Sequence, residues 1–183
     1  MKTFIASGVA AAALVSAASA DVTVTFTNQT WTGWNFTNLS ALYGGFSGTL
    51  TSVSVNATLN ASTNFTYADD LCIYVDVAPL STGGLLQVGG FSSLSPVQRL
   101  SWSGGGSSAP GTPLIDSKSV NPIVFSGAPG APSIYLGNGY GAAGTSGTWT
   151  GSITLVGVNA IPAPGALALL GVAGVAAGRR RRA

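Results

Sequence analysis

The central part of this chain alternates apolar and polar residues with a period of two. In the stretch VTVTFT at residues 22–27, an extended backbone places the apolar side chains on one face and the threonines on the other. The same alternation returns at 53–59, 71–77 and 149–155. Because a helix would spread these apolar residues around its axis, the pattern predicts half-buried β-strands and no helix ahead of the C-terminal tail.

Glycine and proline pairs separate the alternating stretches. Glycine tolerates a positive φ and proline fixes its own φ, so both residues are typical of tight turns. Many short strands joined by such turns predict an all-β chain, folded as an antiparallel β-sandwich or jelly roll over residues 21–160. The turn pairs are Gly44-Gly45, Gly83-Gly84, Gly89-Gly90, Gly104-Gly105-Gly106, Pro110-Gly111 and Pro129-Gly130.

Residues 1–20 have the three parts of an export signal. Met1-Lys2 supplies a basic start, an apolar run follows, and Ala18-Ser19-Ala20 fits a small-residue cleavage site ahead of Asp21. A bilayer-spanning helix needs about 20 apolar residues, and this run is shorter. We therefore interpret residues 1–20 as a signal peptide that is cut before Asp21.

The C-terminal tail carries most of the positive charge of a weakly charged chain. After Pro162 and Pro164, the stretch 165–178 holds no charge, and as a helix it spans about 21 Å, less than the roughly 30 Å of a bilayer core. The arginines that follow favour the cytoplasmic side of a membrane. The sequence therefore predicts a short helix that halts export. The arginines are Arg179, Arg180, Arg181 and Arg182.

This order of elements resembles the PEP-CTERM sorting signal of Gram-negative bacteria. The matching residues are Pro162, Ala163, Pro164 and Gly165, followed by the apolar run and the arginine cluster. The resemblance implies that residues 161–183 are a sorting tail, held transiently in the inner membrane and processed by an exosortase-type enzyme. Ala163 departs from the family pattern, which has Glu there, and this leaves the cleavage site open. The alternative is a permanent single-pass anchor.

A second resemblance lies in the middle of the chain. The stretches 51–55, 70–75 and 147–155 are similar to the jelly-roll P domain that is attached to some secreted proteases. This resemblance implies a β-sandwich accessory module without catalytic residues.

Charge and residue types exclude several functions. Without the two end segments, the chain keeps Arg99 and Lys118 against five aspartates, a net charge of −3, which argues against nucleic-acid binding. The sequence contains no His and no Glu, so His-dependent nucleophilic triads and imidazole metal ligands are excluded. We therefore expect a protein that is not an enzyme, with no catalytic residue, no cofactor and no metal ligand.

Asp69-Asp70 is the one pair of adjacent carboxylates. Aspartate bonds readily to nearby backbone groups, so the pair predicts a turn ahead of the strand that begins at Leu71. A calcium site is the alternative interpretation. Cys72, the single cysteine, lies among apolar residues and is expected to be buried without a disulfide.

Two of the four tryptophans are candidates for contact with a sugar. Trp31 and Trp34 cannot both point inward from one regular strand, because two residues separate them. Trp149 shares the parity of the apolar residues in its stretch and is expected in the core.

These features predict an exported, non-enzymatic protein of the cell surface or extracellular matrix of a Gram-negative bacterium. Its expected partners are the exosortase-type enzyme, the inner membrane during sorting and an extracellular polysaccharide. The alternative is a lectin-like carbohydrate-binding module displayed on the cell surface.

Overall fold

The computed structural model describes residues 21–77, 80–91 and 95–161. The predicted signal peptide, with Ala18 and Ala20, lies outside the described residues. The sorting residues from Pro162 to Gly165 and from Arg179 to Arg182 also lie outside them. Among the described residues, no helix is long and apolar enough to cross a membrane.

The described part of the chain is built almost wholly from β-strands. The two helices are short: α1 spans Leu39–Tyr43, and η1, a 3-10 turn, spans Ala68–Asp70. The strands are β1 (Val22–Thr32), β2 (Asn35–Asn38), β3 (Phe46–Thr63), β4 (Leu71–Asp76), β5 (Leu86–Val88), β6 (Gln98–Leu100), β7 (Thr112–Ser126), β8 (Ser133–Asn138) and β9 (Ser146–Ala160).

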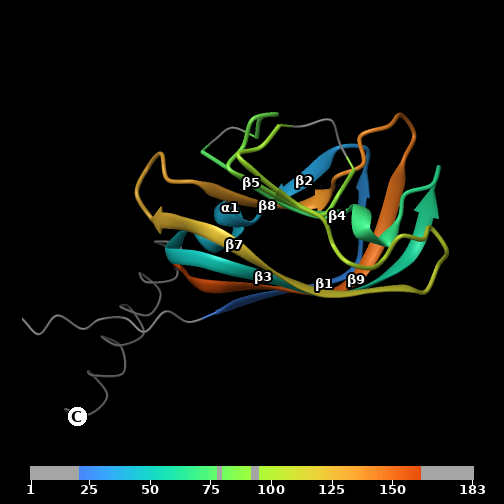
Figure 1. The fold of residues 1–183 in the computed structure, drawn as a ribbon, viewed down its shortest axis with the longest axis horizontal. Helices are drawn as coiled ribbons and strands as arrows, with labels where there is room; N and C mark the ends of the chain where they lie inside the picture. Colours follow the sequence, from blue (N-terminus) through green and yellow to red (C-terminus); the bar gives the residue numbers. More distant parts are fainter. Residues whose placement is uncertain (1–20, 78–79, 92–94, 162–183) are drawn as a thin grey trace, which may run out of the picture.

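The strands form two sheets. The four-stranded sheet has the order β1-β9-β3-β7 and is antiparallel throughout. The five-stranded sheet has the order β2-β8-β4-β5-β6 and is antiparallel except for the parallel pair β5 and β6. In Figure 1 the five-stranded sheet lies above the four-stranded one. The predicted all-β, antiparallel architecture is thus confirmed, and the parallel pair was not expected.

One apolar core joins the two sheets. Side chains from both sheets belong to a single cluster of buried residues, as expected when alternating strands turn their apolar faces toward each other. Trp149 is fully buried within it, which confirms the prediction for this residue. Other fully buried members are Leu50, Leu59, Leu71, Ile73, Leu86, Leu114 and Ile134.

All four alternating stretches fall on strands, in β1, β3, β4 and β9. The sequence did not predict β7, because it contains Pro113 and Pro122, and proline is depleted in strands. The structure accommodates both prolines because β7 lies at the edge of its sheet. Strands β5 and β6 are three residues each, too short to show a period.

The prediction that no helix lies ahead of the tail was wrong for residues 39–43, which form α1. Asn38 caps α1, since its side-chain oxygen accepts the backbone N–H of Ala41 at 3.0 Å. Gly44 ends the helix with a φ of 76°, a left-handed conformation that glycine adopts at no steric cost. One helical turn therefore replaces a simple loop between β2 and β3.

The two ends of the described chain lie at the same end of the fold (Figure 1). Asp21 accepts the backbone N–H of Gly157 at 3.2 Å, and Ile161 donates its N–H to Gly45 at 3.0 Å. Strand β9 runs from Ser146 at the opposite end, and its 15 residues span roughly 50 Å. The η1 turn lies at that opposite end, away from both chain ends (Figure 1).

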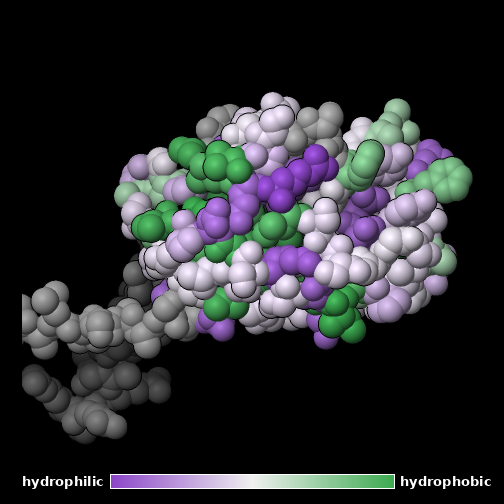
Figure 2. All heavy atoms as spheres, in the orientation of Figure 1, coloured by the Kyte–Doolittle hydropathy of each residue, from purple (hydrophilic) through white to green (hydrophobic). Residues whose placement is uncertain are grey.

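Residues of intermediate hydropathy cover much of the molecular surface. Most atoms in Figure 2 are pale, with separate hydrophilic and hydrophobic patches among them. This fits a chain with only 7% charged residues, in which Ser, Thr and Gly supply the surface.

Candidate functional site

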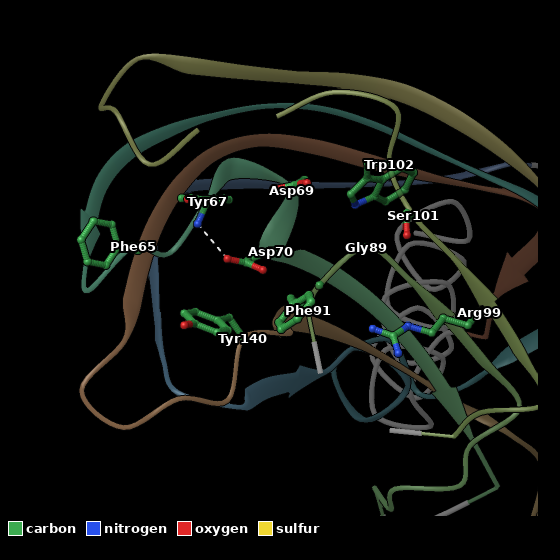
Figure 3. Close-up of a pocket in the computed structure, with 11 residues that line it drawn as sticks. Phe65, Tyr67, Asp69, Asp70, Gly89, Phe91, Arg99, Ser101, Trp102 and Tyr140 are labelled. Atoms are coloured by element: carbon green, nitrogen blue, oxygen red, sulfur yellow. Dashed lines mark hydrogen bonds between the residues drawn. The ribbon is translucent and has the colours of Figure 1, made fainter. Parts of the chain in front are cut away.

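A cleft of about 630 Å³ opens at the end of the fold that carries η1. Its volume falls in the range of small-molecule sites, about 300–1,000 Å³. Figure 3 shows aromatic side chains along one part of the cleft and the arginine at the other. Six parts of the chain line it: the β3–η1 connection, η1, the β5–β6 connection, β6, the segment that follows β6 and the β8–β9 connection. The lining residues are Phe65, Tyr67, Asp69, Asp70, Gly89, Gly90, Phe91, Arg99, Ser101, Trp102 and Tyr140.

Backbone hydrogen bonds fix η1 to two of these segments. The carbonyl of Asp69 accepts the N–H of Gly90 at 2.8 Å, and the carbonyl of Asp70 accepts the N–H of Gly139 at 2.8 Å. The two glycines touch, because a Cβ on Gly90 would lie 2.7 Å from the Cα of Gly139. Larger residues at these two positions would therefore force the backbone junction apart.

The carboxylate of Asp70 lies in the middle of the cleft (Figure 3). One of its oxygens accepts the backbone N–H of Tyr67 at 2.7 Å. Burial raises the pKa of Asp70 to about 6, against the opposing effect of that hydrogen bond, and the neighbouring charge of Asp69 adds to the rise. Burial also raises the pKa of Asp69. The two side chains leave η1 in different directions (Figure 3).

Contacts to both sheets hold the opposite wall of the cleft. The indole N–H of Trp102 donates to the carbonyl of Leu71 at 2.8 Å. The backbone N–H of Ser103 donates to the carboxylate of Asp116 at 2.6 Å, and Lys118 donates to the hydroxyl of Ser103 at 2.6 Å. Asp116 and Lys118 form an ion pair at 3.0 Å. This pair on β7 therefore positions the segment that carries Trp102.

Exposed aromatic rings stand at the mouth of the cleft. Phe65 is 76% exposed and Phe91 is 72% exposed, and Tyr67 is also exposed. Phe91 packs edge-on against Tyr140, with ring centroids 6.3 Å apart, within the roughly 4.5–7 Å that is usual for aromatic pairs. Asn64 and Phe65 both have positive φ values, 51° and 59°, which are uncommon outside glycine. The backbone thus holds Phe65 in a turn that presents its ring to solvent.

The predicted sugar-contact tryptophans lie elsewhere. Trp31 is only 4% exposed, and its indole N–H donates to the hydroxyl of Thr37 at 3.0 Å. Trp34 is half-buried against Phe36 and Tyr74, with its indole nitrogen out of contact with water. The ring of Trp31 packs in the core beside Phe26 and Trp149, so little of it is open to a sugar. Neither tryptophan lines the cleft.

Two other sequence predictions concern Asp69-Asp70 and Cys72, which lie beside the cleft. Asp69-Asp70 forms a turn directly ahead of β4, as predicted. Among the described residues, no group of three or more acidic, Cys or His side chains could hold a metal ion. Cys72 is fully buried as a free thiol, as expected, and burial raises its pKa.

The cleft offers hydrogen-bond acceptors, donors and apolar faces together. The aspartates accept, Arg99 and Ser101 donate, and the aromatic rings supply apolar surface. The sequence patterns point to Asp69 and Asp70 but not to Phe65, Phe91, Arg99 and Tyr140. Phe65, Phe91 and Tyr140 lie in connections between strands, so the available signal for them is an aromatic residue where no strand pattern requires one. Arg99 lies on the short strand β6, and no sequence signal marks it.

Comparison of the chain with protein-family models, with curated proteins and with solved structures finds no match.

Proposed function

We propose that this chain is a non-catalytic protein that is exported and displayed on the surface, or in the extracellular matrix, of a Gram-negative bacterium. The observation that carries the proposal is the order of three sequence elements behind Ile161: the motif from Pro162 to Gly165, an uncharged run and four arginines. An exosortase-type enzyme of the inner membrane would process this tail, and the signal peptide would direct export.

The arrangement of the described residues supports display from this tail. Ile161, the last described residue, leaves β9 at the end of the fold that also holds Asp21. The cleft lies at the other end of β9, beside the connection that carries Tyr140. A domain held by the residues after Ile161 therefore presents the cleft on the side remote from its attachment.

The test is the intact mass of the protein recovered from the surface of a host that expresses an exosortase. We expect a mass that begins at Asp21 and lacks Arg179 to Arg182. Replacing Pro162 and Pro164 with Ala should leave the tail uncut and the protein in the membrane fraction, while Pro129→Ala, in a turn of the described fold, serves as the matched control. Surface protein that keeps its arginines would contradict processing.

A second function, carbohydrate binding at the surface, is favoured by the exposed aromatic rings of the cleft. The β-sandwich would then be a lectin-like module rather than a purely structural one. The jelly-roll assignment and the similarity of residues 51–55, 70–75 and 147–155 to P domains stay predictions beside both functions.

A further inference from the structure

We propose that the cleft beside η1 is a binding site for a neutral carbohydrate, which stacks on Phe91 and Phe65 and exchanges hydrogen bonds with Asp70 and Arg99. This inference deepens the second function and rests on it. It is independent of the sorting tail, since every residue that carries it lies between residues 65 and 140.

The distribution of exposed aromatic rings is the first argument. Among the described residues, the three most exposed aromatic side chains are Phe65, Tyr67 and Phe91, and all three line this cleft. Leaving a phenylalanine side chain exposed costs about 1.5–3 kcal/mol relative to burying it. Three exposed rings that line one concave surface therefore indicate a ligand that covers them. The ring faces match the C–H faces of a pyranose.

Charged groups of both signs line the cleft, and they indicate which class of ligand it can bind. Asp69 and Asp70 supply negative groups on one side, and the guanidinium of Arg99 supplies a positive group farther along (Figure 3). A cationic ligand would meet Arg99, and an anionic ligand would meet the two aspartates. A neutral ligand with many hydroxyls satisfies both, because hydroxyls donate to carboxylates and accept from guanidinium.

Asp70 is placed to accept such a hydroxyl. Asp70 is only 5% exposed, yet it is one of the residues that line the cleft. The carboxylate accepts the backbone N–H of Tyr67 at 2.7 Å, and a backbone hydrogen bond from Phe91 also acts on it. A carboxylate has about four acceptor positions, so capacity remains for a ligand hydroxyl.

Hydrogen bonds tie the segments around the cleft to one another and to the sheets. Gly90 and Gly139 bind η1 from two sides, Trp102 is tied to Leu71, and Ser103 is tied to Asp116. A preformed site loses less conformational entropy on binding, which favours weakly interacting ligands such as neutral sugars.

The first experiment measures binding of the full-length chain, purified in a sugar-free non-ionic detergent, to an array of immobilised glycans. The array carries neutral hexose, pentose and deoxyhexose polymers, acidic polymers that contain uronic acids, and choline as a cationic probe. We expect saturable binding to at least one neutral polymer. Binding only to the acidic polymers or only to choline overturns the proposal, as does binding to none.

The second experiment assigns the binding to the cleft by substitution. Phe91→Ala and Phe65→Ala should each weaken binding about tenfold, as expected for a ring that contacts the ligand. Asp70→Asn should weaken it by a similar factor, since the amide preserves the acceptor for Tyr67 but loses the charge. Ile115→Ala is the matched control, because Ile115 is as exposed as Phe91, at 72%, and lies outside the cleft.

The outcomes separate this proposal from the sorting proposal. Equal affinity of Phe91→Ala and Ile115→Ala for the neutral polymer would place the sugar elsewhere and overturn the site. Circular dichroism of each variant shows whether the fold is retained, and both replaced rings are solvent-exposed. A change in the mass of the surface protein bears on sorting only, because binding is measured on the uncut chain.

Discussion

The outer faces of the two sheets come from the same kind of alternating sequence, yet only one of them is open to water. On the four-stranded sheet, the outward residues are mostly threonines and serines that bond across strands. Hydroxyls of Thr23 and Thr154 lie 3.0 Å apart, and those of Thr30 and Thr148 lie 2.7 Å apart. This face therefore meets water mainly through hydroxyl groups.

The outer face of the five-stranded sheet is covered. Every residue of β4 is buried, so both of its faces are shielded. Cys72, Tyr74 and Tyr135 form a second cluster there, against which Phe36 and Leu80 pack. The hydroxyl of Tyr74 accepts the backbone N–H of Gly84 at 2.8 Å, which fixes the covering β4–β5 connection to the sheet.

This difference shows which properties of a strand follow from the alternation of its residues and which do not. A period of two shows which residues share a face of a strand, but the covering of that face depends on loops far away in sequence. The residue types on the outer face of a strand indicate whether that face is covered. Thr and Ser between apolar residues indicate a face open to water, whereas Cys and Tyr in the same positions, as in β4, indicate a second apolar layer.

The largest expected contrast is in thiol reactivity. Cys72 lies on the covered face with no exposed surface, and burial raises its pKa, so it should react with a chromogenic disulfide reagent only when the fold opens. A thiol introduced on the open face, as Thr25→Cys in a Cys72→Ala background, should react at least ~1,000-fold faster, given ordinary opening free energies. Similar rates for the two thiols would mean that the β4 face is open.

The second contrast is in packing free energy. Tyr74→Ala removes the central ring of the covered face and should lower the free energy of unfolding by about 3–5 kcal/mol in urea titrations. Tyr74→Phe keeps the ring and removes only the acceptor for Gly84, so it should cost about 1–3 kcal/mol. A loss below about 1 kcal/mol for Tyr74→Ala would contradict the second layer.

Much of the four-stranded sheet could be predicted from sequence, and much of the cleft could not. Strands β1, β3 and β9 carry their period locally, so their core faces follow from the pattern wherever no bulge shifts the register. The cleft instead depends on the contact of Gly90 with Gly139 and on the tie between Ser103 and Asp116, which join segments distant in sequence. No local pattern encodes such tertiary contacts.

The helix α1 and strand β7 were missed for local reasons. A single turn capped by Asn38 is too short to show a 3.6-residue period. Pro113 and Pro122 argue against a strand unless its place at a sheet edge is known. Trp31 lies in the core because the strand passes a bulge near Asn28, where φ is 48°, and the parity of the later residues changes.

The third contrast is in pH dependence, between a buried and a hydrogen-bonded carboxylate. The pKa of Asp70 is raised by burial to about 6, above its usual value of 3.8, so its protonation should stabilise the fold as pH falls from about 6 to about 4. The gain is on the order of 1–2 kcal/mol relative to Asp70→Asn, measured by urea titration at several pH values.

Asp116 should show the opposite behaviour. Burial acts to raise its pKa, but hydrogen bonds from Ser103, Lys118 and Ser117 outweigh burial and lower the pKa to about 2. Its stabilising effect is present above about pH 4 and is lost as pH falls toward 2, and Asp116→Asn should remove that loss. Relative to the parent protein, the stability of Asp70→Asn should fall as pH falls from about 6 to 4, and that of Asp116→Asn should rise as pH falls from about 4 to 2. Relative changes of the same sign for the two variants would contradict the assigned environments.

The smallest expected effect is on the open face. Thr23→Ala and Thr154→Ala each remove one hydroxyl of a pair that water can replace, so each should cost no more than about 0.5 kcal/mol. In a double-mutant cycle, the coupling free energy between the two substitutions should also stay below about 0.5 kcal/mol. If the coupling reached several times that value, the threonine rows would contribute to stability as a cooperative network, and the open face would no longer be the energetically neutral side of the comparison.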